Sequence, residues 1–140
     1  MCLTQDKLSS ALNIAFKKMQ KSFYILAQEH KIATCQWSAL KTLYNHDGLT
    51  ISQLSEKLFT KNSSMTTLVD RLERDGYVKR ERKASDRRVI RIFLTDKGIA
   101  TNKSLPDFEK YFTGIAGKKL TPEEINTLKK LLNKLSESID

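Results

Sequence analysis

The sequence predicts a mainly α-helical fold with one small β-ribbon, and three observations lead to this prediction. Apolar residues recur at steps of three and four over most of the 140 residues, which is the spacing of helices with one buried face. Alternating β-prone residues occur between residues 77 and 94, on either side of a short polar run. Five Gly and two Pro residues leave little room for disordered segments.

Residues 49–98 contain the elements around which the rest of the chain is organised. Thr50 is placed to cap a first short helix, in which apolar residues follow at helical spacing. These residues are Ile51, Leu54 and Leu58. The buried face of a second helix is marked by Met65, Leu68, Val69 and Leu72. Gly76 lies just beyond this second helix, where a helix stop is expected.

The ribbon is predicted from two β-prone runs, residues 77–83 and 89–94, which are joined by a polar tip at residues 84–88. The second run alternates apolar residues with an outward-pointing Arg91. Those apolar residues are Ile90, Ile92 and Leu94. Thr95 then caps the next helix. Helix, turn, helix and ribbon together form a winged helix-turn-helix, the arrangement that places one helix in the major groove of DNA.

A long amphipathic helix is predicted before this unit, at about residues 5–30, with its lysines largely off the apolar face. Its apolar stripe consists of Leu8, Leu12, Ala15 or Phe16, Met19, Phe23 and Leu26. Such a long helix cannot bury its stripe against a small domain by itself, so pairing with a second subunit is expected. A core helix follows at residues 34–45, with Trp37 as its large packing anchor.

Beyond the ribbon, a helix is expected to run from Thr95 past Pro106, which should kink or break it, to an end marked by Gly114 and Gly117. Residues 121–124, a Thr followed by Pro and two acids, form a strong helix start. The last helix carries a second apolar stripe: Ile125, Leu128, Leu131 or Leu132, Leu135 and Ile139. The predicted organisation is one domain, residues 1–140, with a winged helix-turn-helix at 34–98 and dimerisation helices at 1–30 and 99–140.

Positive charge is concentrated in the central stretch. The formal net charge is +9 and the pI is near 9.6. Residues 57–91 carry eleven Lys and Arg against five Asp and Glu. A charge excess confined to one segment favours a polyanionic partner, and a solvated basic face is the alternative.

Several classes of protein are excluded by what the sequence lacks. No apolar run approaches the ~20 residues that span a bilayer, and the first 20 residues lack the apolar core of a signal peptide. We therefore expect a cytoplasmic protein without a membrane partner, in which Cys2 and Cys35 form no structural disulfide. No Cys/His cluster has zinc-finger spacing, so no metal or cofactor is expected. Because no phosphate loop or nucleophile elbow occurs, we do not expect an enzyme.

Four short motifs in the central stretch are specific in combination, although each alone is weak. They are Leu68-Val69-Asp70-Arg71-Leu72-Glu73, Asp75-Gly76-Tyr77-Val78, Asp86-Arg87-Arg88 and Leu94-Thr95-Asp96-Lys97-Gly98. With them, nearly the whole chain resembles the MarR family (multiple antibiotic resistance regulators). The resemblance implies a triangular homodimer, in which the terminal helices intertwine and two wings reach outward toward double-stranded DNA.

Polar side chains on the second helix, opposite its buried face, are candidates for contacts with bases and phosphates. The candidates on and beside this helix are Lys61, Asn62, Ser63, Ser64, Thr66, Thr67, Arg71 and Arg74. Ser64 alternatively shares in capping the helix. An ordinary solvated helix face is the alternative interpretation of the whole row.

The wing tip supplies the remaining candidates: Lys83, Asp86, Arg87 and Arg88. Because Asp86 stands two residues before Arg88, its carboxylate can hold the guanidinium in one orientation and lower the entropy lost on insertion. The resemblance assigns Arg88 to the narrow minor groove. Arg82, Lys83 and Arg87 are expected to contact phosphates, and a solvated tip with a weak surface ion pair is the alternative.

We therefore expect a homodimeric regulator of a palindromic operator, a repressor released by a small molecule. The resemblance implies a phenolic or amphipathic acid in a cleft between the dimerisation and DNA-binding regions. Four aromatic residues are candidates for lining it, although ordinary core packing is the alternative: Phe16, Phe23, Trp37 and Tyr44.

Two other functional hypotheses stay open. The trigger is alternatively an oxidant sensed by Cys35 or Cys2, but neither clearly occupies the position of the sensing cysteine in the family. Cys35 is interpreted as a small buried residue and Cys2 as a residue of the frayed terminus. The alternative of a different class is a non-catalytic protein-binding module, against which the basic wing argues.

Overall fold

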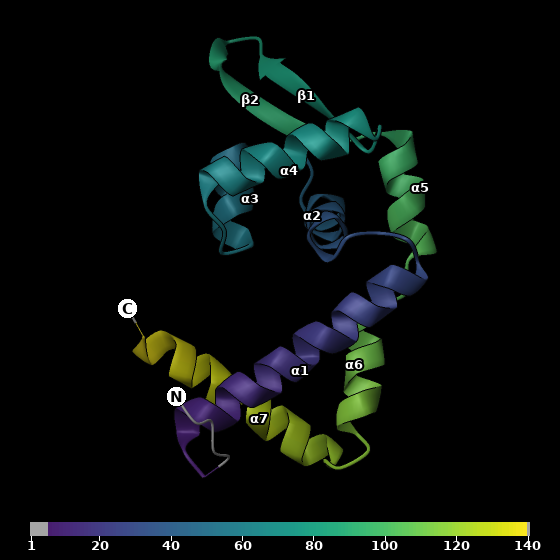
Figure 1. Ribbon diagram of the computed structural model, residues 1–140. Helices are drawn as coiled ribbons and strands as arrows, with labels where there is room; N and C mark the ends of the chain where they lie inside the picture. Colours follow the sequence, from purple (N-terminus) through teal and green to yellow (C-terminus); the bar gives the residue numbers. More distant parts are fainter. Residues whose placement is uncertain (1–5, 140) are drawn as a thin grey trace. The chain divides into compact units, whose positions relative to one another are not determined.

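The computed structural model describes residues 6–139 and divides the chain into two compact units, residues 1–105 and 106–140 (Figure 1). The first unit contains α1 (Leu8–Glu29), α2 (Thr34–Asn45), α3 (Ile51–Lys57), α4 (Asn62–Arg74), β1 (Val78–Lys83), β2 (Asp86–Leu94) and α5 (Asp96–Ser104). The second unit contains α6 (Phe108–Ala116) and α7 (Pro122–Ser138). The predicted fold class, mainly helical with a two-stranded wing, is confirmed.

The core of the first unit forms around α2, which contacts α1, α3, α4, α5 and β2. Its inward side chains are buried: Trp37, Ala39, Leu40 and Leu43. The neighbouring elements bury Leu54 from α3, Met65, Val69 and Leu72 from α4, and Ile92 from β2. Burying an apolar side chain of this size contributes about 1.5–3 kcal/mol, so this core holds α4 and the base of the wing on α2.

The helix-turn-helix begins with the predicted cap. The Thr50 hydroxyl accepts a hydrogen bond from the Gln53 backbone N–H at 3.2 Å, and the Gln53 side chain accepts one from the Thr50 N–H at 2.9 Å. This reciprocal capping box satisfies two backbone donors that would otherwise lack partners. After α3, Phe59 has a φ of 53° and a side chain that is 96% exposed.

The wing is an antiparallel pair of strands (Figure 1). Val78 lies opposite Leu94, and Arg82 lies opposite Ile90. An irregularity follows Arg82, so that Lys83 pairs with Asp86. The prediction of a tip at residues 84–88 was therefore too long. Polar residues can pair in a solvent-exposed ribbon, and β2 already begins at Asp86.

Arg91 does not point outward as predicted. Its side chain is half-buried, and Nη1 donates a hydrogen bond to the carbonyl oxygen of Gly48 at 2.9 Å. This contact arises because residue 49 forms an isolated bridge with Ile92, which brings the chain before α3 alongside β2. Alternation along a strand identifies its two faces but does not show that a loop covers one of them.

α5 begins with the predicted cap, since the Thr95 hydroxyl accepts a hydrogen bond from the Gly98 N–H at 3.1 Å. A Cβ atom at Gly98 would lie 2.2 Å from the carbonyl oxygen of Tyr77, so the close approach of helix and wing requires Gly. α5 ends at Ser104, and the expected kink or break at Pro106 is a break.

The remaining helices differ little from their predicted bounds. α1 begins at Leu8, and the predicted start at residue 5 lies outside the described residues. α6 continues through Gly114 and ends before Gly117; one Gly costs a helix only about 1 kcal/mol, too little to stop it. Thr121 and Glu124 form a second capping box at the start of α7. Within residues 6–139, no helix combines the length and the apolarity needed to cross a bilayer.

Candidate nucleic-acid interface

The outward face of α4 is polar and exposed. Four buried apolar residues fix its inward face: Met65, Leu68, Val69 and Leu72. Successive helical residues turn by about 100°, so the opposite face carries Ser63, Thr67, Asp70 and Arg74. Thr66 and Glu73 lie on one side of this face, and Ser64 and Arg71 lie on the other.

The short polar side chains of α4 leave its first turn open. The hydroxyls of Thr66 and Thr67 donate to the carbonyl oxygens of Asn62 at 2.9 Å and Ser63 at 3.2 Å, which leaves their oxygens free to accept. No side chain caps the helix at Lys61, so the alternative capping role of Ser64 is not observed. An open helix N-terminus, with unpaired backbone N–H groups, is suited to a phosphate.

At the wing tip, Asp86 holds the Arg88 guanidinium as the sequence predicted. Its carboxylate accepts from the Arg88 backbone N–H at 3.0 Å, from Nε at 3.2 Å and from Nη2 at 3.4 Å. These side-chain and backbone hydrogen bonds from Arg88 lower the pKa of Asp86 below its ordinary value. The Arg88 side chain is still 92% exposed, so it is oriented without being covered.

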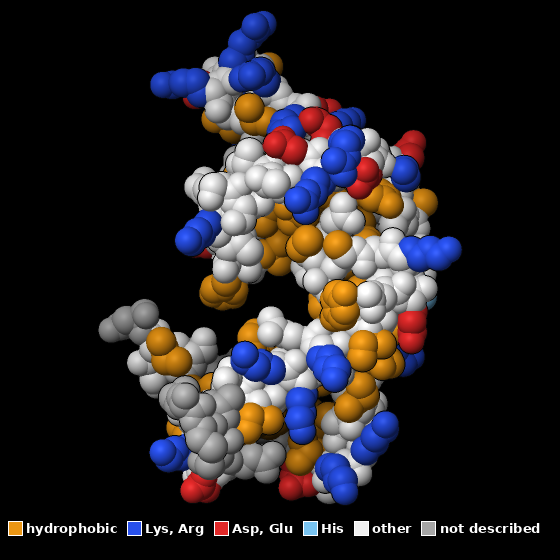
Figure 2. Space-filling model, in the orientation of Figure 1, with side chains coloured by type: hydrophobic (Ala, Val, Ile, Leu, Met, Phe, Trp, Pro, Cys, Tyr) orange, Lys and Arg blue, Asp and Glu red, His pale blue; other side chains and the backbone are white. Residues whose placement is uncertain are grey.

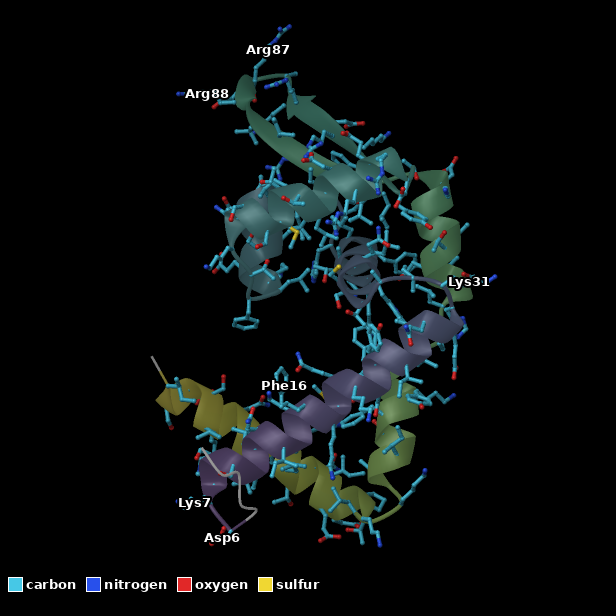
Figure 3. The ribbon with its side chains drawn as sticks, in the orientation of Figure 1. Asp6, Lys7, Phe16, Lys31, Arg87 and Arg88 are labelled. Atoms are coloured by element: carbon cyan, nitrogen blue, oxygen red, sulfur yellow. The ribbon has the colours of Figure 1, made fainter. Side chains whose placement is uncertain are left out.

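The other cations of the tip extend into solvent around this pair. Figure 2 shows Lys and Arg side chains gathered at the end of the wing, and Figure 3 shows Arg87 and Arg88 pointing away from the ribbon in different directions. Arg82 Nη1 donates to the Arg87 carbonyl oxygen at 2.8 Å and so closes the turn. Lys83 is exposed beside it.

A third feature of this surface was not predicted from the sequence. Arg80 of β1 reaches back to α4, where it forms ion pairs with Asp70 and Glu73. Partial burial lowers the pKa of Arg80, but the hydrogen bonds and charges of the two carboxylates outweigh it and raise the pKa above its ordinary value. The spacing of the two acids, three residues apart on an exposed helix face, was the available signal.

The net positive charge belongs entirely to the unit that carries α4 and the wing. Residues 1–105 contain 19 Lys and Arg against ten Asp and Glu, whereas residues 106–140 contain six of each. A positive field confined to one unit draws a polyanion to that unit. No group of three or more His, Cys, Asp or Glu residues in the described part of the chain could hold a metal ion.

The aromatic residues predicted to line a ligand cleft are not gathered in one place. Trp37 is only 2% exposed and packs against Phe23, with ring centroids 4.9 Å apart, so Trp37 is a core residue. Phe16 and Tyr44 are exposed, and Figure 3 shows Phe16 on α1. Phe23 does border a groove of about 380 Å³, whose lining residues are Gln20, Phe23, Tyr24, Thr34, Cys35 and Ser38.

Cys35 is exposed, so its interpretation as a small buried residue was wrong. It lies in the first turn of α2, outside the arc that buries Trp37 and Leu40. Cys35 also borders a second groove of about 200 Å³, which Arg71 and Ser64 help to line. Cys2 lies outside the described residues.

Known proteins share this architecture. The MarR family model matches residues 34–90. The uncharacterized HTH-type transcriptional regulator YsmB of Bacillus subtilis (strain 168) is 32% identical over 134 residues, which cover 96% of this chain and 91% of that protein. The organic hydroperoxide resistance transcriptional regulator of the same organism is 27% identical over 135 residues, covering 96% and 90%.

Among solved structures, the crystal structure of an S. aureus MepR–DNA complex is similar over 95% of this chain and 98% of that one, with a TM-score of 0.85 and 24% identity. This likeness covers all the elements that position α4 and the wing. The family match and the relative that is 32% identical over nearly its whole length lead to one conclusion. The chain belongs to the MarR family and is a DNA-binding transcription regulator, not an enzyme.

Proposed function

We propose that this regulator is a homodimeric repressor that binds a palindromic operator and is released by a small phenolic or amphipathic acid. The observation that carries the DNA-binding geometry is the wing tip, where Asp86 orients an exposed Arg88. In this proposal α4 lies in the major groove, and its polar face contacts base edges and phosphates. Arg88 enters the adjacent minor groove, while Lys83 and Arg87 contact phosphates.

Homodimerisation is supported by large apolar side chains that stay exposed on the terminal helices. On α1 these include Leu8, Leu12 and Phe16, and on α7 and just after it they are Leu128, Leu131, Leu132 and Ile139. Each set recurs at steps of three and four, so it forms a continuous stripe on its helix. A stripe of this kind is suited to burial by a second copy of the chain, which assigns residues 1–30 and 99–140 to dimerisation.

The effector site that we propose is the groove between α1 and α2. Phe23 and Tyr24 offer aromatic surface there, and Gln20 and Ser38 offer hydrogen-bonding groups, which together suit a phenolic acid. An oxidant is the second candidate trigger, because the Cys35 thiol is exposed in the same groove. The name of the Bacillus subtilis relative that is 27% identical, organic hydroperoxide resistance regulator, supports this second candidate.

Footprinting of the DNA upstream of its own gene tests the proposal, together with sedimentation of the free protein. We expect a dimer and a protected palindrome with half-sites roughly one helical turn, about 10 base pairs, apart. A folded monomer, or the same weak affinity for every duplex, would contradict it. Salicylate should release wild-type protein and the Cys35→Ser variant equally, whereas release by an organic hydroperoxide that the variant resists would assign the trigger to Cys35.

A further inference from the structure

Arg80 is held differently from the other cations of the wing. It lies within β1, yet its guanidinium turns back to α4, where Nη1 lies 2.7 Å from Oε1 of Glu73 and Nη2 lies 2.5 Å from Oδ1 of Asp70. The Arg80 side chain is 26% exposed, against 92% for Arg88 at the tip. Arg80 therefore has its planar fork divided between two carboxylates of another element and is not directed at a ligand.

We infer that Arg80 is a positioning residue for DNA binding: by joining β1 to Asp70 and Glu73 of α4, it fixes the direction in which the wing extends. The inference rests on the DNA-binding geometry proposed above. It concerns how the two contacting parts, the polar face of α4 and the wing tip, are kept at a set spacing.

Two side chains anchor the ribbon beyond its buried base: Arg91 of β2 donates to the Gly48 carbonyl oxygen before α3, and Arg80 of β1 is bonded to α4. Within β1, Val78 is buried and Arg80 is half-buried, whereas the last three residues of the strand are exposed. A two-stranded ribbon is only marginally stable without packing on a third element. Arg91 holds the ribbon to the segment before α3, and the hydrogen bonds from Arg80 are the side-chain link that ties it to α4 itself.

The length of the wing makes its direction important. Strands rise about 3.3 Å per residue, so the tip at Ala84 lies roughly 13 Å beyond Arg80. A swing of about 10° at Arg80 would move the tip by roughly 2 Å, which exceeds the tolerance of a hydrogen bond to DNA. Arg88 can be well oriented by Asp86 and still miss its groove if the whole ribbon is free to swing.

The same ion pairs also change the charge that α4 presents. Asp70 lies on the outward face of α4 and Glu73 beside it, where their negative charges oppose the approach of phosphates. Removing both carboxylates therefore gives opposite expectations. If only charge matters, Asp70→Asn/Glu73→Gln binds DNA more tightly. If Arg80 positions the wing through these acids, the variant binds more weakly despite its more positive surface.

We would measure operator affinity at fixed salt for wild type, Asp70→Asn/Glu73→Gln, Arg80→Lys and Lys79→Gln. Lys79→Gln is the matched control, because Lys79 is a cation of the same strand whose ion pair, with Glu81, stays within β1. We expect the double variant to lose about ten-fold or more, comparable to the loss of one specific contact. Arg80→Lys should lose at least about five-fold, since one ammonium cannot bridge both acids in the same geometry.

Hydrogen exchange over residues 78–94 supplies the readout of position, with circular dichroism to verify folding. Weaker binding by the double variant, together with faster exchange in the wing, supports the inference. The inference is overturned if the double variant binds as tightly as wild type or more tightly, or if Arg80→Lys keeps wild-type affinity. It is also overturned if Lys79→Gln loses as much affinity as these two variants, or if hydrogen exchange in the wing is unchanged. If wild type itself protects no specific site, the proposed function fails; if it does and the variants behave as wild type, only the role of Arg80 fails.

Discussion

Replacing Arg88 by Ala tests the geometry of the wing tip most directly. Its side chain is 92% exposed and is bonded to Asp86, so the substitution should change the stability of the fold by no more than about 0.5 kcal/mol. Removing one specific contact from a protein–DNA interface costs about 1–3 kcal/mol. The proposed dimer would present two wings, so we expect a loss of about 2–6 kcal/mol, which is at least roughly 30-fold in affinity.

Fluorescence anisotropy with the operator and with a scrambled duplex, at one salt concentration, measures this loss. Arg87→Ala is the matched control, because Arg87 is at the same tip and its carbonyl oxygen, not its guanidinium, is the group bonded within the turn. As a phosphate contact, Arg87 should contribute about one unit of salt slope and little specificity. Arg88→Ala should instead reduce the preference for operator over scrambled duplex.

Asp86→Asn separates orientation from charge. The substitution removes a negative charge beside the DNA, so charge alone predicts tighter binding. The structure predicts weaker binding, because the carboxylate that fixes the Arg88 guanidinium is lost. The reasoning would be refuted if Arg88→Ala kept wild-type affinity for an operator that wild type distinguishes from the scrambled duplex.

Three further predictions concern single residues. Gly98→Ala should lower the Tm by about 5 °C or more, because its Cβ would meet the Tyr77 carbonyl oxygen at 2.2 Å. Phe59→Gly should raise the Tm by about 3 °C, because Gly adopts a φ of 53° without the penalty of roughly 1 kcal/mol that Phe incurs. The pKa of Asp86 should return toward its ordinary value in Arg88→Ala, measured by NMR titration. Folding lowers the pKa of Asp86, so its carboxylate is fully ionised and bonded to Arg88 above the ordinary carboxyl pKa. These hydrogen bonds are lost only as the pH falls through the lowered pKa of the folded protein.

The helices could be predicted because their signals are local. Thr50, Thr95 and Thr121 each cap a helix from within three residues, and the spacing of apolar residues reports which face is buried. The hydrogen bonding of Arg88 to Asp86 was predictable for the same reason, since the two residues are two positions apart on one strand. The start of β2 was missed because the polarity of its first residues indicated a turn.

The features that sequence could not supply depend on segments distant along the chain. The burial of Trp37 confirms its prediction as a packing anchor, but helical spacing alone could not exclude a role in lining a cleft, which depends on Phe23 of another helix. Cys35 is a local exception, because it is exposed through its position on α2, just outside the arc of buried residues. The ion pairs of Arg80 require the wing to fold back along α4, which the motif containing Asp70 does not reveal.

The number of Lys and Arg residues in residues 57–91 overstates how many of them are available to contact DNA phosphates. All five acids in this segment are paired, with Arg74, Lys79, Arg80 and Arg88 as their partners. These four cations are therefore partly neutralised, and in our proposal Arg80 acts by positioning the wing and not by contacting a phosphate. The cations left for phosphates include Lys83 and Arg87 at the tip. A salt titration distinguishes cations that contact phosphates from an arginine that only positions the wing. Each phosphate contact adds about 0.9 to the steepness of log K against log salt, and a positioning arginine adds none. Losing Arg80 should thus weaken binding without the loss of slope that replacing a phosphate contact at Lys83 produces.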